Sequence, residues 1–233
     1  MAISIKIIGQ GRATLAGEVR EEIERMIVEG TLAPGDKLNE LTLSNAMGVS
    51  RGTVREAIRS LADSGLIDLV ANRGAFVHET TLHEIRNLYD LRGAIFAMAC
   101  AAAARRVAEG AEPDLAGHLK ANLHQMKATL KNNDTETYYP LNIAFHEMLL
   151  DSACNPRAKA MYDNIIKEMH LFRRQGLSIA TNIARSFEEH RTISEAVTTG
   201  DPEAARAAAE YHITSGLKRY MSLAEKNDTA ANG

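Results

Sequence analysis

The sequence predicts a mostly α-helical protein made of two domains. Hydrophobic residues make up 45% of the 233 residues, while aromatic residues are only 5% and tryptophan is absent. Such a core must be aliphatic and rich in alanine, which favours helices. Apolar residues recur at helical spacing through most of the chain, except over residues 66–77. A shift of composition near Thr80 sets the expected domains at 1–78 and 79–226, with a disordered tail over 227–233.

The first domain is expected to hold three helices. Apolar residues from Leu15 to Ile27 recur at helical spacing, and Pro34-Gly35 makes a turn that no helix crosses. A short helix over residues 38–47 closes at Gly48, because glycine is favoured where a helix ends in the left-handed conformation. Ser50 then offers an N-cap hydroxyl to the third helix.

Residues 66–77 change to the pattern of a small β-hairpin, with Asn72-Arg73-Gly74 at its turn. Helix, glycine-centred turn, helix and hairpin, in that order, form the layout of a winged helix-turn-helix. The sequence therefore predicts a DNA-binding domain whose third helix enters the major groove.

The exposed face of that third helix carries Arg51, Arg55 and Arg59, spaced four residues apart. Arginine makes bidentate contacts with guanine and with phosphate. The formal net charge of the chain is only -3, so any basic surface has to be local. On spacing alone, an ordinary solvated helix face remains the simpler interpretation of these arginines.

The local sequence favours the DNA-binding interpretation. Residues 38–77 read LNELTLSNAMGVSRGTVREAIRSLADSGLIDLVANRGAFV, which closely resembles the DNA-binding domain of the GntR family of bacterial regulators. The resemblance implies that the recognition helix and the wing contact an operator. Two positions depart from the pattern: Gly52 stands where many members carry a side-chain donor, and Leu41 where some carry a DNA-contacting arginine. The predicted DNA-contacting residues are Ser50, Arg51, Thr53, Arg55, Arg59, Asn72, Arg73 and Gly74.

The second domain is expected to be an all-α bundle of six to seven helices. The helices are placed at residues 82–109, 113–131, 134–152, 156–173, 179–199 and 202–224. This half resembles the effector-binding domain of the FadR-type branch of the family, termed FCD. The residues that carry this looser resemblance are Phe145-His146, Glu189-His190, Ile193, Gly200-Asp201, Ala205 and His212.

Three histidines on separate helices of this bundle are flanked by apolar residues at helical spacing. They are His146, His190 and His212. Neutral imidazole is a good ligand for zinc, nickel and other first-row ions, although a single buried histidine is more often a satisfied core residue. The resemblance implies that all three bind a divalent metal, with Zn or Ni expected. It places Asn142 where metal-binding members have an aspartate, so Asn142 would be a neutral fourth ligand.

A small carboxylate effector is expected beside this metal. Arg92 matches an arginine often found near the effector pocket, and it can pair with a carboxylate. A surface or interface salt bridge is an equally good interpretation of Arg92. Phe96 stands where many members have glutamate, so this wall of the pocket is expected to differ.

Other classes of function fit less well. His146-Glu147 begins an HExxH pattern that fails at Leu150, and no P-loop, GxSxG or dinucleotide-binding motif occurs, so we expect no enzyme. A purely architectural bundle would gain nothing from buried histidines.

The apolar run 97–104 ends at two arginines and is too short to span a membrane. We expect a cytoplasmic homodimer that represses transcription from double-stranded operator DNA and does not contact the membrane.

Overall fold

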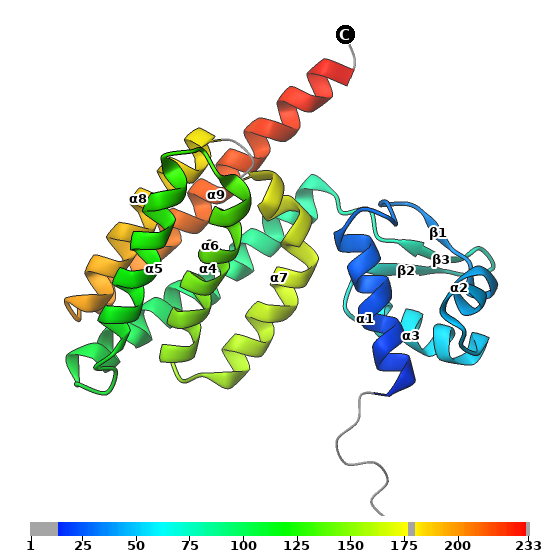
Figure 1. The fold of residues 1–233 in the computed structure, drawn as a ribbon, viewed down its shortest axis with the longest axis horizontal. Coiled ribbons are helices and arrows are strands. Elements are labelled where there is room, and N and C mark those ends of the chain that lie inside the picture. Colours follow the sequence, from blue (N-terminus) through cyan, green and yellow to red (C-terminus); the bar gives the residue numbers. More distant parts are fainter. Residues whose placement is uncertain (1–13, 177–179, 232–233) are drawn as a thin grey trace, which may run out of the picture. The chain divides into compact units, whose positions relative to one another are not determined.

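The computed structural model describes the backbone of residues 14–176 and 180–231, and the side chains of residues 14–169 and 181–223 (Figure 1). Contacts divide the chain into two compact units, Met1–Thr80 and Thr81–Gly233. The sequence-based boundary after residue 78 lies two residues earlier.

The first unit is a winged helix-turn-helix, as the sequence predicts. Its antiparallel sheet has the strand order β1-β3-β2, and β2 pairs with β3 from Ile67 opposite Val77 to Val70 opposite Gly74. The elements are α1 (Leu15–Val28), β1 (Lys37–Leu38), α2 (Glu40–Met47), α3 (Arg51–Asp63), β2 (Ile67–Val70) and β3 (Gly74–Val77).

The start of α2 corrects the sequence analysis, which placed a helix over residues 38–47. Leu38 belongs instead to β1, where it is buried and pairs with Ala75. The side chain of Asn39 accepts hydrogen bonds from the amides of Leu41 and Thr42, which fixes the first turn of α2. Isolated apolar residues cannot reveal a two-residue strand, because the pairing partner is distant in sequence.

A single apolar core holds the helices of this unit together. The buried residues of α1 are Val19, Ile23 and Ile27, and they share one hydrophobic cluster with the buried face of α3. Gly48 closes α2 with a φ of 66°, as predicted, because a left-handed residue lets the chain turn directly into α3.

The second unit is an all-helical bundle, which confirms the predicted class. Within the described residues it contains α4 (Leu82–Ala108), α5 (Leu115–Leu130), α6 (Thr135–Ser152), α7 (Pro156–Gly176), α8 (Ala180–Thr198) and α9 (Pro202–Ala231). The long helix α4 packs against α6, α7, α8 and α9, and α5 packs against α6 and α8 (Figure 1). No described helix is long and apolar enough to cross a membrane.

The C-terminal end of the chain differs from the expected disordered tail over 227–233. Helix α9 continues to Ala231, and residues 232 and 233 lie outside the described part. Extending a helix that has already formed is much easier than starting one, so α9 can continue into the polar end of the chain.

Candidate DNA-reading surface and metal centre

Helix α3 turns one face into the core and the other to solvent. Its buried residues are Val54, Ala57, Ile58 and Leu61. The three predicted arginines, Arg51, Arg55 and Arg59, are all exposed. The N-cap is Ser50, whose hydroxyl accepts from the amide of Thr53 at 3.1 Å and lies 2.9 Å from the Thr53 hydroxyl. Ser50 and Thr53 therefore stabilise the start of the helix that presents the arginines.

The three arginines differ in their ion pairs and hydrogen bonds. Arg55 donates two hydrogen bonds to the carboxylate of Glu40 on α2, at 2.9 and 2.7 Å. Arg51 lies 3.6 Å from the same carboxylate, and Arg59 has no ion pair within the described residues. The hydrogen-bonded guanidinium of Arg55 keeps the pKa of Glu40 below its usual range, so this carboxylate is charged at neutral pH.

The wing is a tight turn between β2 and β3. The amide of Arg73 donates to the carbonyl of Val70 at 3.0 Å, and Asn72 has a φ of 61°, which asparagine tolerates better than most residues. Gly74 has a φ of 107°, a conformation that strongly favours glycine. The guanidinium of Arg73 lies 5.5 Å from the ring centre of Phe76, so the predicted wing residues form an exposed cationic tip.

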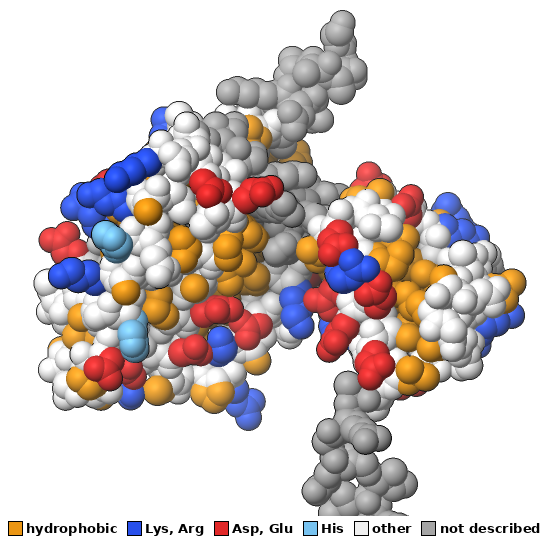
Figure 2. Space-filling view, in the orientation of Figure 1, with side chains coloured by type: hydrophobic (Ala, Val, Ile, Leu, Met, Phe, Trp, Pro, Cys, Tyr) orange, Lys and Arg blue, Asp and Glu red, His pale blue; other side chains and the backbone are white. Residues whose placement is uncertain are grey.

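Acidic and basic side chains are unevenly distributed on this unit. Figure 2 shows acidic side chains gathered over α1, and basic side chains toward the edge where the strands and α2 lie. The acidic residues of α1 are Glu18, Glu21, Glu22 and Glu24. A local basic surface therefore exists despite the net charge of -3 for the whole chain.

In the helical unit, the three predicted histidines converge. His146 on α6, His190 on α8 and His212 on α9 are all buried, and their potential ligand atoms lie within 4.8 Å of one another. The Nε2 atom of His146 is 3.1 Å from Nε2 of His212 and 3.4 Å from Nε2 of His190. The resemblance-based prediction that these three side chains meet is borne out by this geometry.

The Nδ1 atom of each ring lies close to a polar side chain outside the histidine cluster. Nδ1 of His212 lies 2.8 Å from a carboxylate oxygen of Glu189, Nδ1 of His146 lies 2.9 Å from the hydroxyl of Tyr162, and Nδ1 of His190 lies 3.3 Å from that of Tyr138. A carboxylate can only accept, so Nδ1 of His212 is the donor, and in the neutral imidazole this leaves the lone pair on Nε2. Burial raises the pKa of Tyr138, which keeps its hydroxyl protonated.

This arrangement fits a divalent cation. Nitrogen ligands about 2.0–2.1 Å from a zinc ion lie about 3.0–3.4 Å apart in octahedral or tetrahedral geometry. The distances from Nε2 of His146 to Nε2 of His212 and of His190, 3.1 and 3.4 Å, match this spacing. Outer partners on Nδ1 are the usual support of metal-binding imidazoles. Asn142 is buried and lies one turn before His146 on α6, on the same helix face.

Apolar rings and one buried arginine border the cluster. Phe96 stacks on His146 with ring centres 4.1 Å apart, and Phe145 lies 4.5 Å from His190. Arg92, one turn before Phe96 on α4, is 4% exposed. Its Nε donates to the hydroxyl of Tyr162 at 3.0 Å, which links Arg92 to His146. No carboxylate of the described residues of this chain pairs with Arg92.

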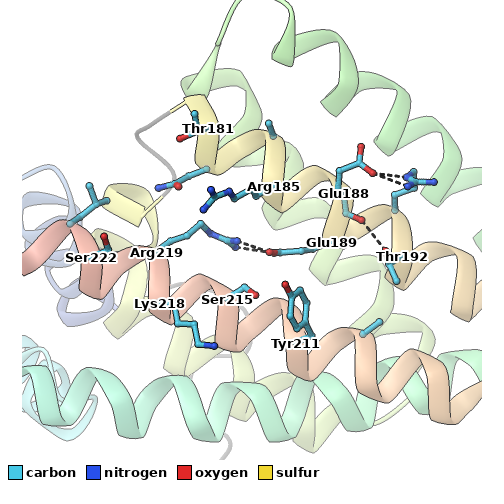
Figure 3. Close-up of a pocket in the computed structure, with 15 residues that line it drawn as sticks. Thr181, Arg185, Glu188, Glu189, Thr192, Tyr211, Ser215, Lys218, Arg219 and Ser222 are labelled. Carbon is cyan, nitrogen blue, oxygen red and sulfur yellow. Dashed lines mark hydrogen bonds and ion pairs between the residues drawn. The ribbon is translucent and has the colours of Figure 1, made fainter.

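A groove between α8 and α9 is lined by Glu189, the carboxylate that holds His212 from outside the cluster (Figure 3). At its floor the guanidinium of Arg219 donates two hydrogen bonds to the carboxylate of Glu189, at 2.6 and 3.0 Å. Glu189 also holds His212, so one buried carboxylate connects the groove to the histidine cluster. The view in Figure 3 shows the pair between the two helices, with Arg185 and Lys218 nearby.

Sequence reasoning assigned no role in these sites to five residues that support them. Tyr138, Tyr162 and Arg219 lack any local sequence signal, because their partners lie on other helices. Glu40 precedes the recognition helix by a full element and shows no periodic relation to Arg55. Only Glu189 had a signal, as the neighbour of His190 in the family pattern.

Comparisons with known proteins agree with both units. Residues 15–77 match the family described as bacterial regulatory proteins, gntR family, and residues 87–215 match the FCD domain. The chain is 27% identical to the HTH-type transcriptional repressor RspR of Escherichia coli over 205 residues, which cover 88% of each protein. It is 30% identical to the galactonate operon transcriptional repressor of Escherichia coli, covering 85% of this chain and 93% of that one.

Solved structures show the same fold. A GntR-type regulator from Rhodococcus sp. RHA1 superposes with a TM-score of 0.69 at 23% sequence identity, covering 89% of this chain and 97% of the other.

Proposed function

Because this chain belongs to the GntR family of bacterial transcription regulators and carries an FCD domain, we propose that it is a metal-dependent repressor. In this proposal a small organic acid, bound beside the metal in the helical unit, releases the protein from its operator. The acting species is a homodimer in the cytoplasm, bound to a pseudo-palindromic site. One small DNA-binding domain makes few contacts with DNA, and a two-fold symmetric dimer doubles their number.

The DNA contacts come from α3 and the wing. Arg51 and Arg55 lie toward the beginning of α3, the end that recognition helices insert into the major groove, and Arg73 extends from the wing toward phosphate or the minor groove. Arg59 lies further along the helix, where it contacts the DNA backbone. Ser50 and Asn72 shape the surface, and the backbone at Gly74 lets the wing approach phosphate.

The observation that carries the proposal is the convergence of three Nε2 atoms whose rings are each held from outside at Nδ1. Imidazole ligands suit zinc and nickel, and the amide oxygen of Asn142 completes a set without negative charge. A metal held by these side chains keeps its full positive charge and has positions left for an anionic ligand.

The buried guanidinium of Arg92 supports a carboxylate effector. A buried charge is normally paired, yet among the described residues the hydrogen-bond partner of Arg92 is the neutral hydroxyl of Tyr162. A carboxylate would satisfy both the metal and the free donors of Arg92. One relative represses a galactonate operon, and galactonate is a hydroxycarboxylate.

Release from the operator follows from differential affinity. The acid can weaken DNA binding only if it binds a non-operator arrangement of the dimer more tightly than the operator-bound one. A shift of the DNA affinity by a factor of about 5–150 is the usual range for such coupling.

Metal content tests the first part of this proposal. We expect purified wild-type protein, dialysed against zinc or nickel, to retain metal in elemental analysis, and His190→Ala to lose most of it. His124→Ala is the matched control, because His124 is an exposed histidine on α5 of the same unit. Retention of wild-type metal content by His190→Ala would exclude the proposed site, whereas equal losses in both variants would point to adventitious surface binding.

A further inference from the structure

The surface that presents the recognition helix contains one acidic residue in a position that needs an explanation. Glu40 is the first residue of α2, directly after the N-cap Asn39, and its side chain is 27% exposed. A carboxylate beside a DNA-binding surface repels phosphate, which weakens binding to any DNA sequence. Its position next to Arg55 must therefore serve something other than general affinity.

The contact between Glu40 and Arg55 is bidentate. Oε1 of Glu40 accepts from Nε of Arg55 at 2.9 Å, and Oε2 accepts from Nη2 at 2.7 Å. A guanidinium has five N–H groups in a planar fork, and this contact occupies the edge formed by Nε and Nη2. The edge formed by Nη1 and Nη2 stays available and faces away from the carboxylate. Two parallel donors on one edge are what O6 and N7 of guanine accept.

We propose that Glu40 is a positioning residue that makes Arg55 read guanine, while the less restrained Arg51 contacts phosphate. This inference rests on the proposed role of α3 as the recognition helix. Fixing the guanidinium plane before binding leaves less side-chain freedom to be lost on the correct base. The same restraint keeps Arg55 from turning toward a phosphate, so a wrong base leaves its donors unpaired.

Arg51 provides the internal contrast. Its Nη2 lies 3.6 Å from Oε2 of Glu40, beyond hydrogen-bond distance, and its side chain is 60% exposed, against 49% for Arg55. A loosely held arginine can follow the DNA backbone whatever the sequence, and phosphate contacts carry no direct sequence information. The two arginines, one turn apart on α3, therefore divide affinity and specificity between them.

The test begins with selection of binding sites from a randomised DNA duplex library by wild-type protein and by Glu40→Gln. The matched control is Glu56→Gln, because Glu56 is an exposed acid on α3 that has no ion pair among the described residues. Both substitutions remove one negative charge, so both should raise affinity for a scrambled duplex similarly. We expect Glu40→Gln to lose the preference for one guanine in each half-site by about tenfold, and Glu56→Gln to keep it.

A modified base then tests the contact itself. Replacing that guanine by 7-deazaguanine removes the N7 acceptor, and we expect about a tenfold weaker complex with wild type but less than a threefold change with Glu40→Gln. An unchanged guanine preference in Glu40→Gln would overturn the inference. So would tighter operator binding by Glu40→Gln with the full guanine preference, because Glu40 would then only mask Arg55. Failure of wild type to enrich any sequence would instead contradict the proposed function. Equal thermal unfolding temperatures of the three proteins exclude a folding defect.

Discussion

Each unit of the protein contains a glutamate that binds an arginine through two hydrogen bonds. The two pairs differ in their exposure to solvent. In the DNA-binding unit, Glu40 and Arg55 are 27% and 49% exposed. In the helical unit, Glu189 and Arg219 are only 10% and 8% exposed, and Glu189 also holds His212 (Figure 3). The chemistry of the pairs is the same, but their burial differs.

The difference shows how burial decides what an ion pair does. The exposed pair is screened by solvent and contributes little to folding, so it is free to orient Arg55 for a partner outside the protein. The buried pair has lost its hydration, so each partner is needed to compensate the other. In the helical unit the same contact leaves neither buried charge unpaired, and its carboxylate also holds His212, a candidate metal ligand.

Removing the two glutamates should therefore have very different effects on stability. We expect Glu189→Ala to lower the free energy of unfolding of the helical unit by about 3–5 kcal/mol, because Arg219 remains buried without its partner. Glu40→Ala should leave the urea midpoint of the DNA-binding unit nearly unchanged. Both are measured by urea denaturation followed by circular dichroism.

A comparable loss of stability in the two variants would contradict the account of the two pairs. The double variant Glu189→Gln with Arg219→Met separates charge from packing, because it removes both charges at similar volume. It should recover most of the stability that Glu189→Ala loses, since no unpaired charge remains.

The next largest effect concerns the DNA-binding unit alone. We expect Arg55→Ala to weaken binding to a selected operator duplex by at least about tenfold, because a bidentate base contact is lost. Its unfolding midpoint should match that of wild type, since Arg55 is exposed. Fluorescence anisotropy measures the affinity, and wild-type affinity in Arg55→Ala would refute its assignment to the recognition surface.

A smaller effect is expected at the proposed metal centre. Asn142→Asp should tighten zinc binding by about tenfold, because a carboxylate adds a charged ligand where the native set is neutral. Asn164→Asp is the control, an exposed position on α7 that adds the same charge away from the histidines. Competition with a chromophoric chelator measures both affinities, and equal gains would show a general charge effect rather than coordination by residue 142.

The two sites also differ in how far the sequence could predict them. The recognition helix and the wing lie within residues 50–74, so their order and spacing are visible along the chain. The histidines come from three helices, and their convergence followed from the family resemblance rather than from spacing. Tyr162 and Arg219 could not be found, because an outer support is defined only by the packing of helices that are distant in sequence.

Local errors of the sequence analysis have similar physical causes. Leu38 was assigned to a helix because its apolar side chain suits either element, and only pairing with Ala75 decides for a strand. The end of α9 is expected to be disordered on composition, whereas the helix continues to Ala231, because extending a formed helix is easier than starting one. Periodicity detects long helices well, but short strands and helix ends depend on their neighbours.

The central claim is that the buried site of the helical unit controls the exposed surface of the DNA-binding unit. Its most direct test is the affinity of metal-loaded protein for a fluorescent operator duplex during titration with a panel of small mono- and dicarboxylates, compared between wild type and Arg92→Met. The account predicts that at least one acid weakens DNA binding of wild type by fivefold or more, with Arg92→Met responding little although it binds the duplex equally well. Equal release of both proteins by that acid, or no response of wild type to any member of the panel, would contradict it.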